Sequence, residues 1–120
     1  MFNSIDKILK PKSEEDIIKS LVKFSKKELE QQLFKSCVRN EISKISLLLK
    51  HGVNVNCRDN AKRTPLIISA LIGKEDLCKL LIQNGAFINA KDNKGESPLK
   101  KATIWQSDDV IELLKQNGAK

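Results

Sequence analysis

Residues 52–66 read GVNVNCRDNAKRTPL, and residues 85–99 read GAFINAKDNKGESPL, so that the two stretches align at an offset of 33 residues without a gap. Gly118 and Ala119 begin a further copy at the same offset. A fixed period of about 20 to 50 residues is typical of stacked supersecondary units, not of one mixed core. The sequence therefore predicts a repeat architecture.

Each repeat contains the signals of two short helices that follow a turn. Thr64 can cap a helix, because its hydroxyl accepts from a free backbone amide, and Pro65 suits the first helical position. Gly73 ends this helix, and the acidic pair at residues 75–76 favours the start of a second one through the helix dipole. Turn-forming residues then fill positions 85–96, and the next copy has the same order of signals.

An earlier copy, 33 residues upstream, is less regular. Residues 31–33 read QQL where the later copies have TPL or SPL, and Asn40 replaces Gly73. The leucine triplet at residues 47–49 nevertheless aligns with the apolar residues 80–82. The sequence thus predicts three copies, of which the first is the most divergent.

Residues 1–30 do not repeat. The segment SEED at residues 13–16 resembles a capping box ahead of apolar residues at helical spacing, which predicts a helix at about residues 14–24. SKKE at residues 25–28 is a second such box, which opens the helix of the first copy. We expect the helix at 14–24 to cover the apolar end of the first repeat, because repeat arrays need end caps. We expect the stretch at 4–10 to be loosely ordered.

This pattern resembles that of ankyrin-repeat proteins, whose unit of about 33 residues is a β-turn with two helices and a T-P-L-H-x-A signature. The match covers residues 31–120. It implies an all-α repeat solenoid, an ankyrin-like stack of helix–turn–helix units joined by β-turn fingers. The implied division is an N-terminal helical cap at 1–30 and repeats at 31–63, 64–96 and 97–120.

Single positions depart from the ankyrin pattern. Lys62 stands where the turn usually has a glycine, which Gly95 keeps. The usual histidine is replaced in the three copies by Phe34, Ile67 and Lys100. The last copy has Lys100, Lys101 and Lys115 in place of Ile67, Ile68 and Ile82. Because we expect these positions to face a following repeat, the lysines predict that the array ends at residue 120.

The composition is basic and free of membrane signals. The 120 residues carry a formal net charge of +7, and residues 31–63 contribute an excess of five, from seven basic and two acidic side chains. Such an excess favours solubility and acidic partners. No apolar run approaches the roughly 18–20 residues that span a bilayer, and the N-terminus lacks the apolar core of a secretory signal. Three cysteines without close pairing suit a reducing compartment, so we expect a cytoplasmic location.

The inventory of catalytic side chains is small. His51 is the one histidine, and we expect it to be exposed and not a metal ligand. Cys37, Cys57 and Cys78 occupy small or apolar repeat positions and are interpreted as packing residues. No phosphate-binding loop and no G-x-S-x-G motif occurs. The sequence therefore predicts no enzyme activity, no catalytic residue, no cofactor and no metal.

Polar residues recur in the turns at identical repeat positions. They are Asn56 and Asn89, together with Asp59 and Asp92. In ankyrin-like folds such residues hydrogen-bond neighbouring loops together. The resemblance therefore implies a structural role for them, in preference to a metal or sugar site.

A solenoid presents a long concave surface of turn tips and inner helices. The resemblance implies that the variable positions beside the turn aspartate, before the cap residue and late in the first helix contact a partner. The predicted partner-binding residues are Val38, Arg39, Arg58, Asn60, Arg63, Leu71, Ile72, Lys91, Asn93, Lys94, Ile104 and Trp105.

Five of these positions are apolar where solvent-facing residues are usual, namely Val38, Leu71, Ile72, Ile104 and Trp105. A contiguous exposed apolar strip marks an interaction site, and Trp and Arg are enriched among binding hot spots. Basic turn tips beside this strip predict a partner with an acidic rim. The other interpretation is that the N-terminal segment or extra helical turns fold over the strip and bury it.

The leading hypothesis is a non-catalytic protein-binding module, either a small adaptor or an inhibitor of the immunity-protein type, monomeric when free. The alternative is the binding of nucleic acid or another polyanion through the basic first repeat. That alternative lacks the interleaved aromatic residues expected for strand stacking, because the chain has no tyrosine and only four phenylalanines. No contact with a membrane is expected.

Overall fold

A computed structural model describes residues 13–120 of the chain. Within this range the backbone forms helices, turns and loops and no strand. The helices are α2 (Glu14–Leu21), α3 (Lys26–Val38), α4 (Ile42–Lys50), α5 (Pro65–Ile72), α6 (Glu75–Gln83), α7 (Pro98–Ile104) and α8 (Asp108–Gln116). The predicted all-α repeat fold is therefore confirmed.

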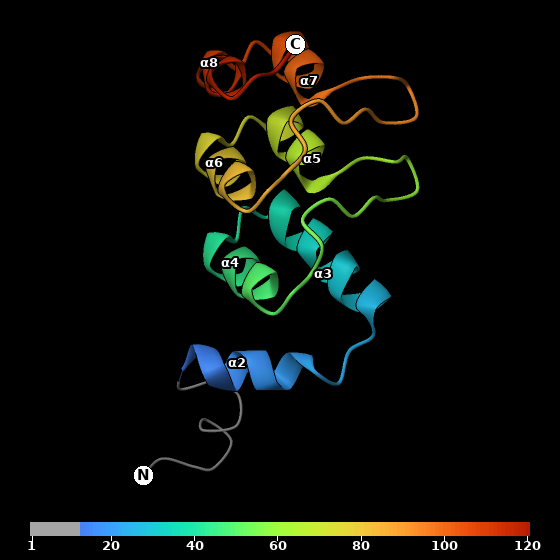
Figure 1. Ribbon diagram of the computed structural model, residues 1–120, viewed down its shortest axis with the longest axis vertical. Helices are drawn as coiled ribbons and strands as arrows, with labels where there is room; N and C mark the ends of the chain where they lie inside the picture. The colour runs from blue at the N-terminus through green and yellow to red at the C-terminus, as the bar shows by residue number, and fades with distance from the viewer. Residues whose placement is uncertain (1–12) are drawn as a thin grey trace.

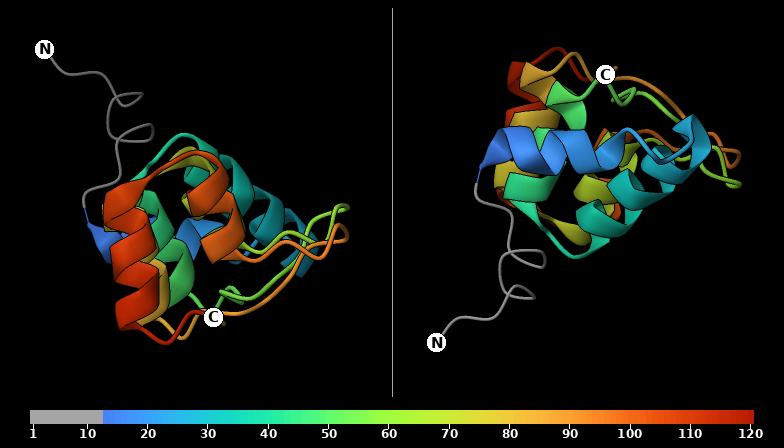
Figure 2. Two further views of the ribbon diagram at one scale, coloured as in Figure 1. Left: turned by 90° about the horizontal axis from the view of Figure 1, so that it is seen from above. Right: turned by 90° about the horizontal axis from the view of Figure 1, so that it is seen from below.

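Three helical hairpins stack on one another in chain order (Figure 1). Helices α3, α5 and α7 form one layer, and α4, α6 and α8 form the other. Two long loops project to the same side of the stack (Figure 2); we call residues 53–63 the first finger and residues 86–96 the second finger. The inner helices and the fingers together form the concave face.

The core lies between the two layers and continues from one repeat to the next. It consists mainly of aliphatic side chains, several of which recur at the same repeat position in two or three copies. Fully buried members include Leu33, Ile45, Leu48, Leu66, Leu77, Leu81, Val110 and Leu114. Because each repeat buries its apolar face against its neighbours, the fold depends on stacking and not on one central cluster.

The inner helices begin at the caps that the sequence predicts. Thr64 Oγ1 accepts from Ile67 N at 3.2 Å, and Ser97 Oγ accepts from Lys100 N at 3.2 Å. In both helices a proline occupies the first turn, where its missing amide removes no helical hydrogen bond. The box at residues 25–28 is also formed, with reciprocal side-chain and backbone contacts.

Helix α2 lies across one end of the stack and packs against α4 (Figure 1). Its Leu21 is buried, and the helix ends three residues before the predicted limit of 24. The expectation for residues 4–10 lies outside the described residues. In residues 13–120, every helix is too short or too polar to cross a lipid bilayer.

Candidate functional site

The two fingers share one turn, built on an aspartate. In the first finger, Asp59 Oδ1 accepts from the amides of Ala61 at 2.9 Å and Arg63 at 2.8 Å. In the second, Asp92 Oδ1 accepts from the corresponding amides at residues 94 and 96, at 2.9 and 3.0 Å. Each carboxylate thereby satisfies two loop amides that have no partner in a helix or sheet.

Asparagines connect each repeat to the next one. Asn56 Nδ2 donates to Gly85 O at 3.1 Å, and Asn56 Oδ1 accepts from Phe87 N at 2.8 Å. Asn89 repeats the arrangement with Gly118 O at 3.3 Å and Lys120 N at 3.0 Å. The structural role implied for these asparagines is therefore confirmed.

Further contacts hold the two fingers side by side. Arg58 Nη1 donates to Lys62 O at 2.8 Å and to Lys91 O at 2.7 Å, which bridges the fingers. The backbone amide of Asn93 donates to Ala61 O at 3.0 Å. Arg58, which was predicted to contact a partner, thus has a structural task in the free chain.

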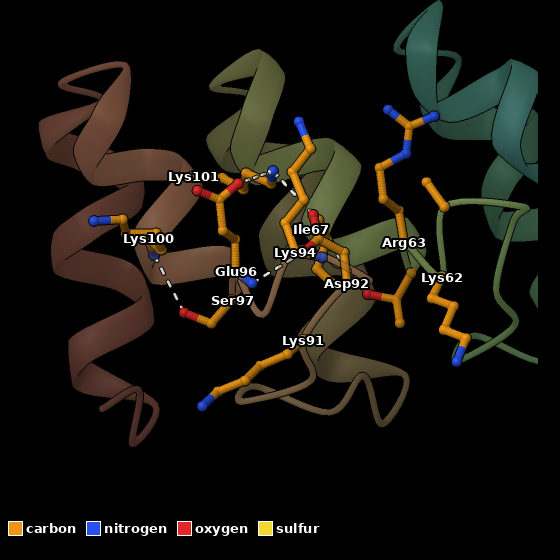
Figure 3. Close-up of polar contacts among 12 residues, drawn as sticks. Lys62, Arg63, Ile67, Lys91, Asp92, Lys94, Glu96, Ser97, Lys100 and Lys101 are labelled. Carbon is orange, nitrogen blue, oxygen red and sulfur yellow. Dashed lines mark hydrogen bonds and ion pairs between the residues drawn. The ribbon is translucent and has the colours of Figure 1, made fainter.

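The fingers differ in the cation that pairs with the aspartate. In the first finger, Arg63 Nε lies 2.8 Å from Asp59 Oδ2, and the arginine side chain stays 40% exposed. In the second, Lys101 reaches back from α7, and its Nζ lies 3.0 Å from Asp92 Oδ2 and 2.6 Å from Glu96 Oε1 (Figure 3). The lysine is buried, with 11% of its side chain exposed.

The ionisation of this second group follows from its contacts. Burial alone would raise the pKa of Asp92, but the hydrogen bonds from Glu96 N, Lys101 Nζ and Lys94 N outweigh burial and lower it. The hydrogen bond to Glu96 is the largest cause that raises the pKa of Lys101, against the opposing effect of burial. Both groups are therefore charged at neutral pH.

Lys101 corrects the expectation for the three lysines of the last copy. Lys100 and Lys115 are exposed, as expected, but Lys101 is buried in an ion-pair cluster and does not face outward. Successive helical residues differ by about 100° in direction. Positions 68 and 101 therefore point toward the fingers and the preceding inner helix, while positions 67 and 100 do not.

The apolar row predicted from the sequence lies at the C-terminal ends of the three inner helices. Val38, Ile104 and Trp105 are 63%, 50% and 64% exposed, and Leu71 and Ile72 are half-buried. Helix α2 lies at the opposite end of the stack from α7 (Figure 1). Among residues 13–120, the N-terminal part of the chain therefore does not cover Trp105.

A groove of about 360 Å³ opens between α3 and α5 on the concave face. Ile68 forms part of it and is buried. Two of the predicted binding residues, Val38 and Arg39, line its α3 side, and Arg63 with Asp59 lines its finger side. The remaining lining residues are Phe34 and Lys35.

The structure thus brings part of the predicted set together. Val38, Arg39 and Arg63 meet in the groove, whereas Asn60, Lys91, Asn93 and Lys94 are exposed on the fingers. Sequence reasoning missed Phe34, Lys35 and Ile68. The signal that could have found them was the replacement of the usual histidine by Phe34, since a large apolar side chain there needs an apolar neighbour.

The other candidate groups do not form a reactive site. Cys37, Cys57 and Cys78 are all buried, and burial is the main cause that raises the pKa of each thiol to about 12, so that the thiolate is absent at neutral pH. In residues 13–120, no group of three or more His, Cys, Asp or Glu side chains could hold a metal ion. His51 is half-buried at the edge of a separate cavity, and not exposed as expected.

Comparison with known proteins places these observations in one family. The family model described as ankyrin repeats, in three copies, matches residues 11–92 and again residues 33–120. The comparison with curated proteins found no match.

Proposed function

The chain belongs to the ankyrin-repeat family, whose repeats generally serve as protein–protein interaction modules, and on that premise we propose that it binds a protein partner through its concave face. In this proposal the repeats at residues 31–120 carry the binding surface, and residues 1–30 cap one end. The chain acts without catalysis, as a small adaptor or an inhibitor. A cytoplasmic location and a monomeric free state remain predictions.

The observation that carries the proposal is the apolar row at the ends of α3, α5 and α7. It comprises Val38, Leu71, Ile72, Ile104 and Trp105, and three of the five are at least half exposed. Keeping a tryptophan and aliphatic side chains in water has a free-energy cost that burial under a partner would remove. Trp105 is the strongest candidate for a binding hot spot.

The free cations of the inner helices and the fingers support an acidic partner. Several exposed cations on the inner helices and fingers form no ion pair with a carboxylate within residues 13–120; they include Lys35, Arg39, Lys62, Lys91, Lys94 and Lys100. Carboxylates at the edge of a partner would speed association and fix its orientation.

The same contacts weigh against a polyanion site on the first repeat. Of its seven basic side chains, Lys50 pairs with Glu14 at 3.1 Å, Arg63 pairs with Asp59, and Arg58 donates to backbone carbonyls. Fewer cations therefore remain free to release counterions from a nucleic acid. We favour a protein partner for this reason.

Affinity capture from a lysate of the source cells tests the proposal. The wild-type chain should retain a protein that the Trp105→Ala variant loses, with an affinity difference of about 2 kcal/mol, or roughly 30-fold in Kd. Because Trp105 is largely exposed, its replacement should leave the melting temperature nearly unchanged.

Phe87 provides a matched control. It is also 64% exposed, and it lies at the start of the second finger, outside the row. Phe87→Ala should keep the captured protein. Equal capture by wild type and Trp105→Ala, or equal loss in both variants, would contradict a role for the row.

A further inference from the structure

The concave face has two equivalent positions for a groove, one between α3 and α5 and the other between α5 and α7. Their residues correspond at the offset of 33, so the chain offers an internal comparison. Position 68 of the first groove corresponds to position 101 of the second, and position 63 corresponds to 96. The pairs are Arg63 with Ile68 in the first, and Glu96 with Lys101 in the second.

Because Ile68 stands where the second groove has Lys101, no ion pair within the described part of the chain bridges the first groove at this position. Ile68 offers an apolar floor, and Phe34 and Val38 provide apolar walls on α3. The Arg63 side chain pairs with Asp59 of its own finger, and the two residues line the finger side of the groove. A volume of about 360 Å³ lies near the lower limit of ligand sites, which are about 300–1,000 Å³. The groove suits one or two side chains, not a large ligand.

The second groove is bridged by charge. The lysine at the position of Ile68 extends toward the second finger, where its ammonium lies between the carboxylates of Asp92 and Glu96 (Figure 3). An apolar side chain entering at this position would displace or bury these charges, which is costly. The two positions therefore differ in the ligand that they accept.

The free charge at the rim of the first groove is positive. Asp59 is satisfied by Arg63 and by two loop amides, so it has little capacity left for a cation from a partner. Lys35 and Arg39 are exposed at the α3 rim, and neither pairs with a carboxylate in residues 13–120. A ligand for this groove is therefore complementary if it carries negative charge beside its apolar part.

We propose that the α3–α5 groove is the anchor site for a partner peptide segment in which a bulky apolar residue is flanked by Asp or Glu. The apolar side chain contacts Phe34, Val38 and Ile68, and the carboxylate pairs with Arg39 or Lys35. The equivalent position between α5 and α7 accepts no such anchor, because Lys101 and the carboxylates of Asp92 and Glu96 occupy it. This inference rests on the proposed function and names the partner chemistry that it requires.

A display library of random short peptides, selected on the immobilised full chain, tests the anchor site. The enriched peptides should share a bulky apolar residue close to Asp or Glu. Their affinity, measured by titration calorimetry, should fall about tenfold or more in the double variant Arg63→Glu/Ile68→Lys. This variant copies the residues of the second groove into the first, so we expect it to fold and to close the anchor site.

The reciprocal variant Glu96→Arg/Lys101→Ile is the matched control, and it should keep the affinity of the enriched peptides. Circular dichroism and urea unfolding check that both variants are folded. If the first variant does not fold, the single change Arg39→Glu, at an exposed position, should still weaken binding several-fold at low salt.

The outcomes separate this inference from the proposed function. The anchor site would be overturned if no peptide were enriched or if the enriched peptides lacked carboxylates. It would also be overturned if they bound Arg63→Glu/Ile68→Lys as tightly as wild type. If enriched peptides lose affinity in Trp105→Ala but not in the groove variants, the anchor site is wrong and the concave-face proposal stands. Peptides sensitive to neither change would contradict both.

Discussion

The first and second fingers have the same backbone and different electrostatics. In both, an aspartate accepts from two loop amides, and an asparagine three residues earlier holds the next repeat. Asp59 pairs with an arginine of its own finger, whereas Asp92 pairs with Lys101 of the following helix. The aspartate therefore fixes the turn, and the position of its cation decides whether the neighbouring groove is open.

The two pairings also differ in solvent exposure. Arg63 is 40% exposed and lies four residues from Asp59, so it can turn to water if the aspartate is lost. Lys101 has no such freedom, because its ammonium lies in a buried site with two carboxylates. Removing one partner of a buried pair leaves an uncompensated charge, which costs more than the loss of an exposed pair.

Replacing the turn aspartates gives the largest expected difference between the fingers. Asp92→Ala should lower the free energy of unfolding by about 3 to 5 kcal/mol, because it leaves Lys101 short of a counter-charge and two amides without an acceptor. Asp59→Ala should cost about 2 kcal/mol, since only the amides and a half-exposed arginine lose a partner. Urea unfolding at neutral pH measures both.

A double variant locates the origin of this difference. Adding Lys101→Met to Asp92→Ala removes the buried cation that has lost one of its two carboxylates, so the double variant should be more stable than the sum of the two single losses implies. Equal losses at Asp59 and Asp92, or additive losses at 92 and 101, would contradict the importance of burial.

The repeat pattern accounts for the parts that the two fingers share. The caps, the asparagine links and the three-copy stack were predictable, because each depends on residues that recur at a constant offset, such as Thr64 and Ser97. The environment of Lys101 was not predictable in this way, since its repeat position corresponds to that of Ile68, an apolar residue. Its ion pairs depend on Glu96, a residue that the other finger replaces by Arg63. When two positions change together between copies, as positions 63 and 68 do, a comparison of single positions does not reveal the ion pair that results.

Replacing the cation of the second finger should have a smaller effect on stability, and this effect should depend on pH. Lys101→Met should cost about 2 kcal/mol at neutral pH, because Asp92 and Glu96 are left as neighbouring carboxylates while Glu96 can turn partly to water. The pKa of Asp92 is lowered in the folded chain, so its contribution is present above the ordinary value of about 3.9 and is lost as the pH falls through the lowered pKa.

Lys101 changes the pH dependence of stability at high pH. Its pKa is raised on folding, so its contribution is fully present below the ordinary value of about 10.4 and is lost as the pH rises through the raised pKa. The gap between wild type and Lys101→Met should thus be constant from about pH 5 to 9 and shrink in acid. Urea unfolding at several pH values measures it. Lys115→Met, at an exposed lysine, should show no gap, and a gap that grows in acid would refute the assignment.

The smallest expected effect lies at the tips of the fingers, where Lys62 and Gly95 occupy the same left-handed position. Their φ angles are +59° and +75°. A side chain there has a strain of about 1–2 kcal/mol, which glycine avoids, and glycine loses about 0.5–1 kcal/mol through its greater freedom when unfolded. Lys62→Gly should therefore stabilise the chain by about 0.5–1 kcal/mol, and Gly95→Lys should destabilise it by a similar amount, as measured by thermal unfolding.

Steric contact does not complicate this exchange, because a Cβ built at Gly95 meets no atom within 4 Å. Charge could complicate it, since Lys62→Gly also removes one cation from a chain of net charge +7. Lys94→Gly separates the two causes: it removes the same charge from the neighbouring finger at a residue without a positive φ. If Lys94→Gly stabilised the chain as much as Lys62→Gly does, relief of charge repulsion would explain the gain. A gain confined to Lys62→Gly assigns it to the backbone of the turn that the two fingers share.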